Sequence, residues 1–208
     1  MPGSNATDIW LFGIDVSHYQ GTIDWAEVKA GPTNFAFIKA TESGDSIDPL
    51  FAQNWAGAEG LDRGAYHFFQ PGVSGATQAE NFLKAWKPAK GDLLPVLDLE
   101  TLGGASQAEL LSEVDAWMSA VTEAIGGKLP ILYTDPGFWP QIGNPTQYSD
   151  HPLWVADYTE AKQPTLPDGW TTYAVWQYSD TGSVKGVSGN CDVDLFNGGP
   201  DAITTIKL

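Results

Sequence analysis

Two carboxylates stand two residues apart at the end of an apolar run. The run from Leu93 to Glu100 reads LLPVLDLE and closes with Asp98 and Glu100. Side chains alternate between the faces of a strand, so both acids project to the same side, with Cα atoms about 6.5 Å apart. Such a pair can divide acid and base work, because one carboxyl can be held protonated while the other stays charged. A lone D-x-E is also a short pattern, whose acids can face solvent or cap a helix.

Further acids lie at the ends of other expected strands. Asp15 stands near the end of the first apolar run, and Asp192 and Asp194 stand in the last one. The first and last strands of a closed barrel are neighbours, so Asp15 should lie beside the Asp192 region and face Asp98 across the mouth. A ring of carboxylates without His or Cys partners suits cleavage of a glycosidic bond better than metal binding or acyl transfer. Taken singly, each of Asp15 and Asp192 is as strongly expected to cap a loop as to take part in chemistry.

The elements that position these acids alternate strands with helices. Strands are expected at 10–16, 35–41, 64–69, 93–100, 129–134, 153–158, 172–179 and 191–196. Helices are expected after Asp24, from Asp48-Pro49, around Phe82 to Trp86, and from the Ser106 capping box to Gly126-Gly127. Five β/α units followed by about three strands with few helices indicate an α/β fold, a single TIM-like barrel of parallel strands.

Length, charge and cysteine content narrow the class of protein. The 208 residues suit one domain, expected over residues 9–208, while Met1 to Asp8 is expected to be a disordered leader or a cloning remnant without signal-peptide features. No run of about 18 apolar residues predicts a membrane span. The net charge of −16 argues against nucleic acid and anionic membranes as partners. The single cysteine, Cys191, excludes an intramolecular disulfide and a cysteine-rich metal site, and no cofactor is suggested.

Several ordered blocks make the chain resemble the glycoside hydrolase family 25 lysozymes, the Chalaropsis-type N-acetylmuramidases. They cover nearly the whole chain and comprise FGIDVS at 12–17, FIKATE at 37–42, GAYHF at 64–68, DLE at 98–100, ILYT at 131–134, LWVA at 153–156, WQY at 176–178 and GNCD at 189–192. The resemblance implies a flattened barrel that hydrolyses the β-1,4 bond between N-acetylmuramic acid and N-acetylglucosamine in bacterial peptidoglycan.

The resemblance also implies a role for each acid. Glu100 would be the general acid that protonates the leaving oxygen and later deprotonates water. Asp98 would stabilise either the oxocarbenium charge or an oxazolinium formed by the substrate's acetamido group, and the family favours net retention with acetamido participation. Asp15 and Asp192 would complete an acidic ring that binds the sugar. The family often reads Asp-x-Asn where this chain has Asp192-Val193-Asp194, so Asp194 is the alternative for the ring position.

Aromatic residues on the barrel strands are candidates for contact with the glycan. The candidates are Tyr66, Tyr133, Trp154 and Trp176. Those that point to the mouth could stack on a sugar or donate a hydrogen bond to it. Each of them is equally expected to be a core residue without contact to the glycan. His18 and His67 are expected to be structural residues rather than bases.

Other functions stay open on the sequence alone. Chitinase-like endo-N-acetylglucosaminidases also end a strand in D-x-E, but they carry a further acid two residues before the Asp, where this chain has Val96. A non-catalytic peptidoglycan-binding barrel would be free to lose Asp98 or Glu100, and both are present. A phage endolysin, a wall-remodelling enzyme and a secreted lysozyme would share these residues. We expect a monomer that acts on the bacterial wall, either secreted or phage-encoded.

Overall fold

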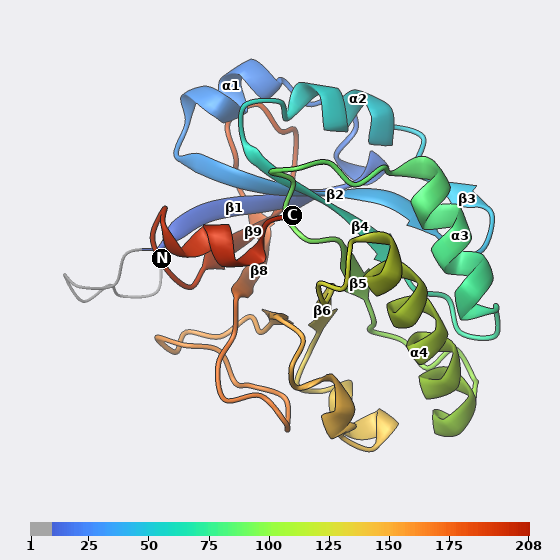
Figure 1. Cartoon of the computed structure of the whole chain (residues 1–208). Coiled ribbons are helices and arrows are strands. Elements are labelled where there is room, and N and C mark those ends of the chain that lie inside the picture. Colours follow the sequence, from blue (N-terminus) through green and yellow to red (C-terminus); the bar gives the residue numbers. More distant parts are fainter. Residues whose placement is uncertain (1–9) are drawn as a thin grey trace.

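The computed structural model describes residues 10–208, in which eight strands close into a barrel (Figure 1). In ring order they are β1 (Leu11–Val16), β2 (Thr33–Glu42), β4 (Asp62–Phe68), β5 (Val96–Asp98), β6 (Ile131–Thr134), β7 (Leu153–Ala156), β8 (Val175–Gly182) and β9 (Cys191–Phe196), which pairs again with β1. The short strand β3 (Ser46–Ile47) pairs with β2 alone. The expected leader, Met1 to Asp8, lies outside the described residues. The predicted single barrel of the α/β class is therefore confirmed.

The direction of the last strand differs from the expectation. The strands from β1 to β8 in the ring pair in parallel, but β9 runs antiparallel to both of its neighbours, β8 and β1. The expectation of a fully parallel barrel is therefore wrong for β9. A loop without a crossover helix joins β8 to β9, and only antiparallel neighbours can be joined in this way. The N-terminal end of β9 consequently lies at the rim where the parallel strands have their carboxyl ends.

Within residues 10–208, four α-helices lie between the strands of the first half of the barrel, and the second half carries short 3-10 turns in their place. The helices are α1 (Trp25–Ala30), α2 (Phe51–Gly57), α3 (Gly75–Ala85) and α4 (Gln107–Ala124). Figure 1 shows them along the blue-to-olive part of the chain, whereas the orange and red part carries strands, long loops and a short coiled turn. The 3-10 turns lie at His18–Gln20, Trp139–Ile142, Thr146–Tyr148 and Ala202–Ile206. The predicted loss of helices after the fifth unit is confirmed.

The ends of two elements correct the sequence-based expectation. The central strand is confined to Val96–Asp98, although the extended chain continues and the Leu99 amide donates to the Tyr133 carbonyl. The helix expected from Asp48-Pro49 begins only at Phe51. Asp48 instead accepts from the Leu50 amide within the preceding turn, at 2.9 Å. The Ser106 capping box is confirmed, since Ser106 Oγ accepts from the Glu109 amide and the Glu109 carboxylate accepts from the Ser106 amide.

Large aromatic side chains fill the barrel beneath its mouth. Trp154 is buried, and its ring stacks on Phe37 with centroids 4.6 Å apart and makes an edge contact with Tyr133 at 4.8 Å. A Cβ at Gly13 would overlap the Phe35 ring, so this strand position requires glycine. The interior below the mouth is therefore a packed floor and not a channel.

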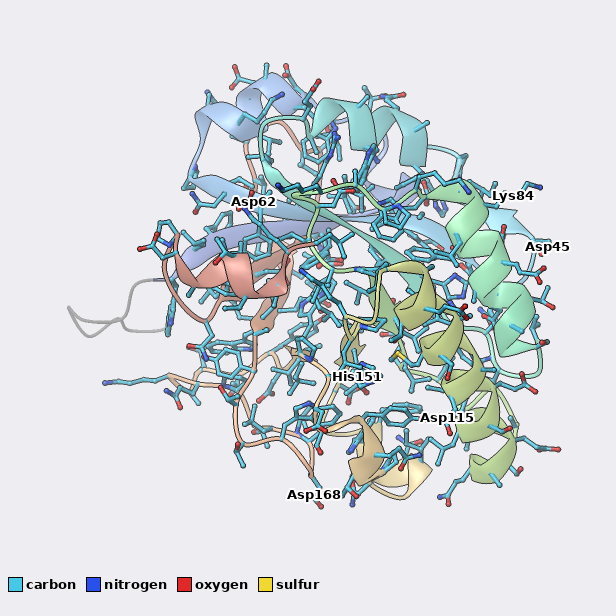
Figure 2. The ribbon with its side chains drawn as sticks, viewed as in Figure 1. Asp45, Asp62, Lys84, Asp115, His151 and Asp168 are labelled. Carbon is cyan, nitrogen blue, oxygen red and sulfur yellow. The ribbon has the colours of Figure 1, made fainter. Side chains whose placement is uncertain are left out.

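The other end of the barrel is closed by the end of the chain. Asp62, which begins β4 and is labelled in Figure 2, forms an ion pair of 2.6 Å with Lys207. Leu93 bridges to the same lysine through its backbone.

Among residues 10–208, no helix has both the length and the apolar character that crossing a bilayer would need.

Candidate active site

A cavity of about 260 Å³ opens at the carboxyl ends of the parallel strands. The sequence places acids there because several strands end in them, and five carboxylates border the cavity: Asp15, Asp98, Glu100, Asp180 and Asp192. The structure thus brings together both members of the central pair and two members of the expected ring. Chemistry in β/α barrels is built at this rim, where loops converge on a rigid floor.

Asp98 and Glu100 lie on the same side of the chain and differ in exposure. Asp98 is buried at the end of β5, and its Oδ1 atom has no hydrogen-bond partner among the described residues. Burial raises the pKa of Asp98 well above its usual value, and the charge of Glu100 adds to the rise. Glu100 reaches solvent, yet partial burial still raises its pKa, followed by the charge of Asp135. Because the charge of Glu100 raises the pKa of Asp98, the protonation states of the two carboxyls are linked.

Asp15 is held by a hydrogen-bond network centred on Gln177. The Gln177 Nε2 atom donates to Asp15 Oδ2 at 2.7 Å. The Gln177 Oε1 atom accepts from the Tyr133 hydroxyl at 2.9 Å and from the Tyr158 hydroxyl at 2.7 Å. Burial raises the pKa of Asp15 well above its usual value, with Asp194 as the largest charge contribution. One amide thus fixes a carboxylate and two tyrosines at the mouth.

The two acids of β9 occupy different depths. Asp192 pairs with Asp15 across the β1–β9 ladder and borders the cavity, and burial followed by the charge of Asp180 raises its pKa to about 6. Asp194 pairs with Gly13 one layer deeper, where it is fully buried. Its Oδ1 atom accepts from Trp154 Nε1 at 2.9 Å, and its Oδ2 atom has no hydrogen-bond partner among the described residues. The structure therefore sets Asp192 in the rim and Asp194 in the floor.

A lysine is the one basic side chain bordering the cavity within the described part of the chain. Lys39 Nζ contacts Glu42 Oε2 at 2.8 Å and lies 4.8 Å from the centre of the Phe68 ring. Gln70 donates to the other oxygen of Glu42 at 2.8 Å, so Glu42 holds the lysine in place. The positive charge of Lys39 lowers the pKa values of Asp98 and Glu100, against the larger effect of burial.

Three of the four expected aromatic contacts border the cavity. They are Tyr66, Tyr133 and Trp154. Trp176 does not reach it, because strand alternation turns Gln177 towards the mouth and Trp176 away. Trp176 is fully buried, and its Nε1 atom donates to the Asp157 carbonyl at 2.8 Å. Of the two roles that the sequence leaves open for Trp176, glycan contact or core, its position fits the core.

Several cavity residues are not singled out by the sequence pattern. Gln177, Tyr158, Tyr19 and Lys39 all border the cavity. Gln177 and Lys39 lie within the WQY and FIKATE blocks, where strand alternation counted from a known cavity residue would indicate their side. Tyr19 and Tyr158 lie in loops after β1 and β7, for which a strand period gives no direction.

The two histidines singled out in the sequence have structural partners. His67 is fully buried between Thr41 Oγ1, at 2.7 Å, and Gln78 Oε1, at 3.0 Å, and burial lowers its pKa to about 4. His18 Nδ1 lies 2.7 Å from Asp48 Oδ2. Neither histidine borders the cavity. Within residues 10–208, no group of three or more His, Cys, Asp or Glu side chains is arranged to hold a metal ion.

Paired carboxylates at the mouth of a β/α barrel, above an aromatic floor, define a barrel glycosidase site. Comparison with known proteins gives the family: residues 14–187 match the model of glycosyl hydrolases family 25, and the chain belongs to this family. The resemblance seen in the sequence is confirmed.

Named relatives and solved structures support this assignment. The chain is 37% identical over 199 residues to Lysozyme M1 of Streptomyces globisporus, covering 89% of this chain and 67% of that protein. It is 33% identical over 204 residues to the N,O-diacetylmuramidase of Chalaropsis sp., covering 86% and 95%. The crystal structure of a bacterial lysozyme from Streptomyces coelicolor superposes with a TM-score of 0.88 at 33% identity, covering 98% of both chains.

Proposed function

We propose that this lysozyme cleaves the β-1,4 bond between N-acetylmuramic acid and N-acetylglucosamine in bacterial peptidoglycan, with Glu100 and Asp98 as its catalytic pair. The observation that carries the proposal is the pair itself, one carboxyl buried and one open to solvent at the same rim. Relatives named lysozyme and N,O-diacetylmuramidase support the substrate class. The other enzyme considered, a chitinase-like glucosaminidase, has no comparable support.

Glu100 acts as general acid and then as general base. Its raised pKa keeps a proton on the carboxyl over a wider pH range than an ordinary glutamate allows. That proton passes to the glycosidic oxygen as the bond from this oxygen to C1 breaks. The resulting carboxylate then removes a proton from the water that attacks C1. Contact with solvent at the cavity gives this water access.

Asp98 stabilises the positive charge that develops on the sugar. When the substrate's acetamido oxygen attacks C1, the acetamido nitrogen gains positive charge and its N–H needs an acceptor. The unpartnered Oδ1 atom of Asp98 supplies a buried acceptor at the same rim. Attack by the acetamido group and then by water inverts C1 twice, so the reaction proceeds with net retention.

The remaining rim residues bind and shape the sugar. Asp15 and Asp192 complete the acidic ring, and the rim position of Asp192 favours it over Asp194. Tyr66, Tyr133 and Trp154 contact the glycan from the floor and walls.

The setting of the enzyme follows from its substrate. We assign residues 9–208 to one catalytic domain that works as a monomer on peptidoglycan glycan strands, without nucleic acid or membrane as a partner. Because peptidoglycan lies outside the cytoplasmic membrane, the enzyme acts there, either secreted or delivered as a phage endolysin.

Digestion of purified peptidoglycan tests the proposal. The new chain ends are reduced with borohydride and identified by mass, for the wild type, for Glu100→Gln and for Glu123→Gln, which makes the same change at an exposed site on α4. We expect reduced muramic acid ends from the wild type and from Glu123→Gln, and a loss of about 10²- to 10⁴-fold in rate for Glu100→Gln. Glucosamine ends would indicate a glucosaminidase, and binding without cleavage would indicate a non-catalytic barrel.

A further inference from the structure

Exposed aromatic rings are concentrated at the cavity. Among the described residues, four large hydrophobic side chains are exposed: Tyr19 at 80%, Tyr158 at 54%, Ile47 at 49% and Leu129 at 36%. Both tyrosines border the acidic cavity, and neither Ile47 nor Leu129 does. The two most exposed rings therefore lie where a substrate binds, although exposed rings are unfavourable in water.

Tyr19 is presented by a turn that hydrogen bonds hold in place. In the 3-10 turn His18–Gln20, Ser17 Oγ accepts from the Tyr19 amide at 3.2 Å, and Gln20 Oε1 accepts from the Ser17 amide at 2.9 Å. Asp48 Oδ2 fixes the neighbouring His18, accepting from its amide at 3.0 Å and contacting its ring at 2.7 Å. These hydrogen bonds hold the backbone under Tyr19, and its ring is exposed to solvent beside the His18 ring, with centroids 4.2 Å apart.

Tyr158 is fixed in a different way. Its hydroxyl donates to Gln177 Oε1 at 2.7 Å, which ties the ring to the network that holds Asp15. The hydroxyl proton is therefore used within the protein, while 54% of the residue stays exposed beside the cavity. A pyranose ring carries a patch of C–H groups that packs on the face of an aromatic ring, while its hydroxyls stay free for polar partners.

The order of strands puts these two rings on either side of the catalytic pair. Asp98 is the last residue of β5, and Glu100 follows the strand. Going round the ring one way, β4 and β2 lead to β1, which Tyr19 follows; going the other way, β6 leads to β7, which Tyr158 follows. A linear glycan whose scissile bond lies at Glu100 can therefore extend towards one tyrosine in each direction across the mouth.

We propose that Tyr19 and Tyr158 are stacking platforms for two sugar rings, one on each side of the cleaved bond. This inference rests on the proposed function and assigns glycan-binding residues beyond the floor residues. The two platforms set how many sugars a glycan must have for tight binding.

Steady-state kinetics on soluble glycan fragments test the platforms. Tyr19→Ala and Tyr158→Ala are compared with Ile47→Ala and Leu129→Ala, which truncate the exposed hydrophobic side chains away from the cavity. We expect KM to rise about tenfold for each tyrosine variant, with a smaller change in kcat, because a ground-state contact is lost. The control variants should keep the wild-type KM. Thermal unfolding of every variant separates these effects from misfolding.

Conservative variants separate the ring from the hydroxyl. Tyr19→Phe and Tyr158→Phe keep the ring, so we expect them to restore KM to within about threefold of the wild type. A KM for Tyr158→Phe as high as that for Tyr158→Ala would assign the effect to the bond with Gln177 and overturn the stacking role.

Fragments of increasing length give a second readout. Lengthening the glycan should lower KM in two steps, one abolished by Tyr19→Ala and the other by Tyr158→Ala. If both alanine variants match Ile47→Ala at every length while the wild type cleaves peptidoglycan, the inference fails and the proposed function stands. If the wild type cleaves no peptidoglycan, the proposed function fails as well.

Discussion

At the scale of single residues, the proton on Glu100 is governed partly by a neighbour outside the cavity. Burial is the larger cause of the raised pKa of Glu100, and the negative charge of Asp135 comes next. Asp135 also has a structural task, because its Oδ1 atom accepts from the amides of Gly137 and Phe138 at 2.8 and 2.9 Å. Asparagine can keep those bonds and remove the charge.

The substitution Asp135→Asn should therefore move the pH–rate profile. A general acid works while protonated, so activity falls as pH rises through the pKa of Glu100. Removing the charge lowers that pKa, and the alkaline limb of kcat/KM should shift to lower pH with little loss of maximal rate. The profile is measured on soluble peptidoglycan fragments. An unmoved limb would show that Asp135 does not act on the catalytic proton.

Asp194 should make stability depend on pH. Burial raises its pKa well above the usual 3.8, and the groups around it are Trp154 on β7, Gln177 on β8, Asp15 on β1 and Asp192 on its own strand. An acid whose pKa is raised by folding contributes stability below its unfolded pKa and loses that contribution as pH rises through the folded value.

Asp194→Asn replaces this acid by a neutral group of the same shape. The variant should melt at a higher temperature than the wild type near pH 8, and the difference should shrink towards pH 4. Asp168→Asn makes the same change at an exposed site, labelled at the lower edge of Figure 2, and should leave the pH dependence unchanged. Parallel melting curves for the wild type and Asp194→Asn across this range would contradict the expectation.

The sequence indicated the acids of the site more fully than its other polar groups. Asp98 and Glu100 are recognisable because two carboxylates interrupt an apolar strand on one face. No local sequence pattern indicates the role of Gln177, because that role depends on two tyrosine hydroxyls and a carboxylate from three other parts of the chain. For Trp176 the sequence leaves the mouth and the core equally open, because strand membership alone does not fix which face points inward.

At the scale of elements, α3 and α4 meet at a contact that requires glycine. The Gly75 amide donates to Glu113 Oε2 at 2.7 Å, and a Cβ at Gly75 would overlap the Glu113 carbonyl oxygen. Because that obstacle is backbone, no rotamer change relieves it.

Gly75→Ala should destabilise the fold by about 1–3 kcal/mol, the usual cost of overpacking. Gly75 is the first residue of α3, so alanine gains at most the roughly 0.5–1 kcal/mol that it brings to a helix interior, which is less than this cost. The melting temperature should fall by about 2–10 °C for a protein of this size. Ser74→Ala, one residue earlier, removes a side chain without a capping hydrogen bond and should have little effect. A stable Gly75→Ala variant would mean that the two helices can separate at small cost.

The sequence predicted which segments form helices and strands better than it predicted the direction of a strand or the residue at which a helix begins. Periodicity and the Ser106 capping box identified α4, since both signals are local. The antiparallel direction of β9 could not be predicted locally, because the alternation of side chains along a strand is the same in either direction. The late start of α2 reflects a tertiary competitor, since Asp48 bonds to His18 from the β1–α1 loop.

At the scale of the whole molecule, the net charge of −16 opposes approach to an anionic cell wall. This repulsion acts over the Debye length, which is about 30 Å at 0.01 M salt and about 10 Å at 0.1 M. Hydrolysis of intact walls should therefore be slow at very low salt and rise several-fold as salt is added up to about 0.1 M. The rate is followed by release of reducing ends.

The origin of this effect can be separated from effects on the active site. Walls stripped of their anionic polymers carry less charge, so the rise with salt should be smaller on them, whereas a change within the cavity would alter both substrates equally. The rise should also appear in KM more than in kcat, because screening assists association and has little effect on the buried carboxyl of Asp98. A rate that only falls as salt is added would mean that local attraction at the binding surface outweighs the net charge of the molecule.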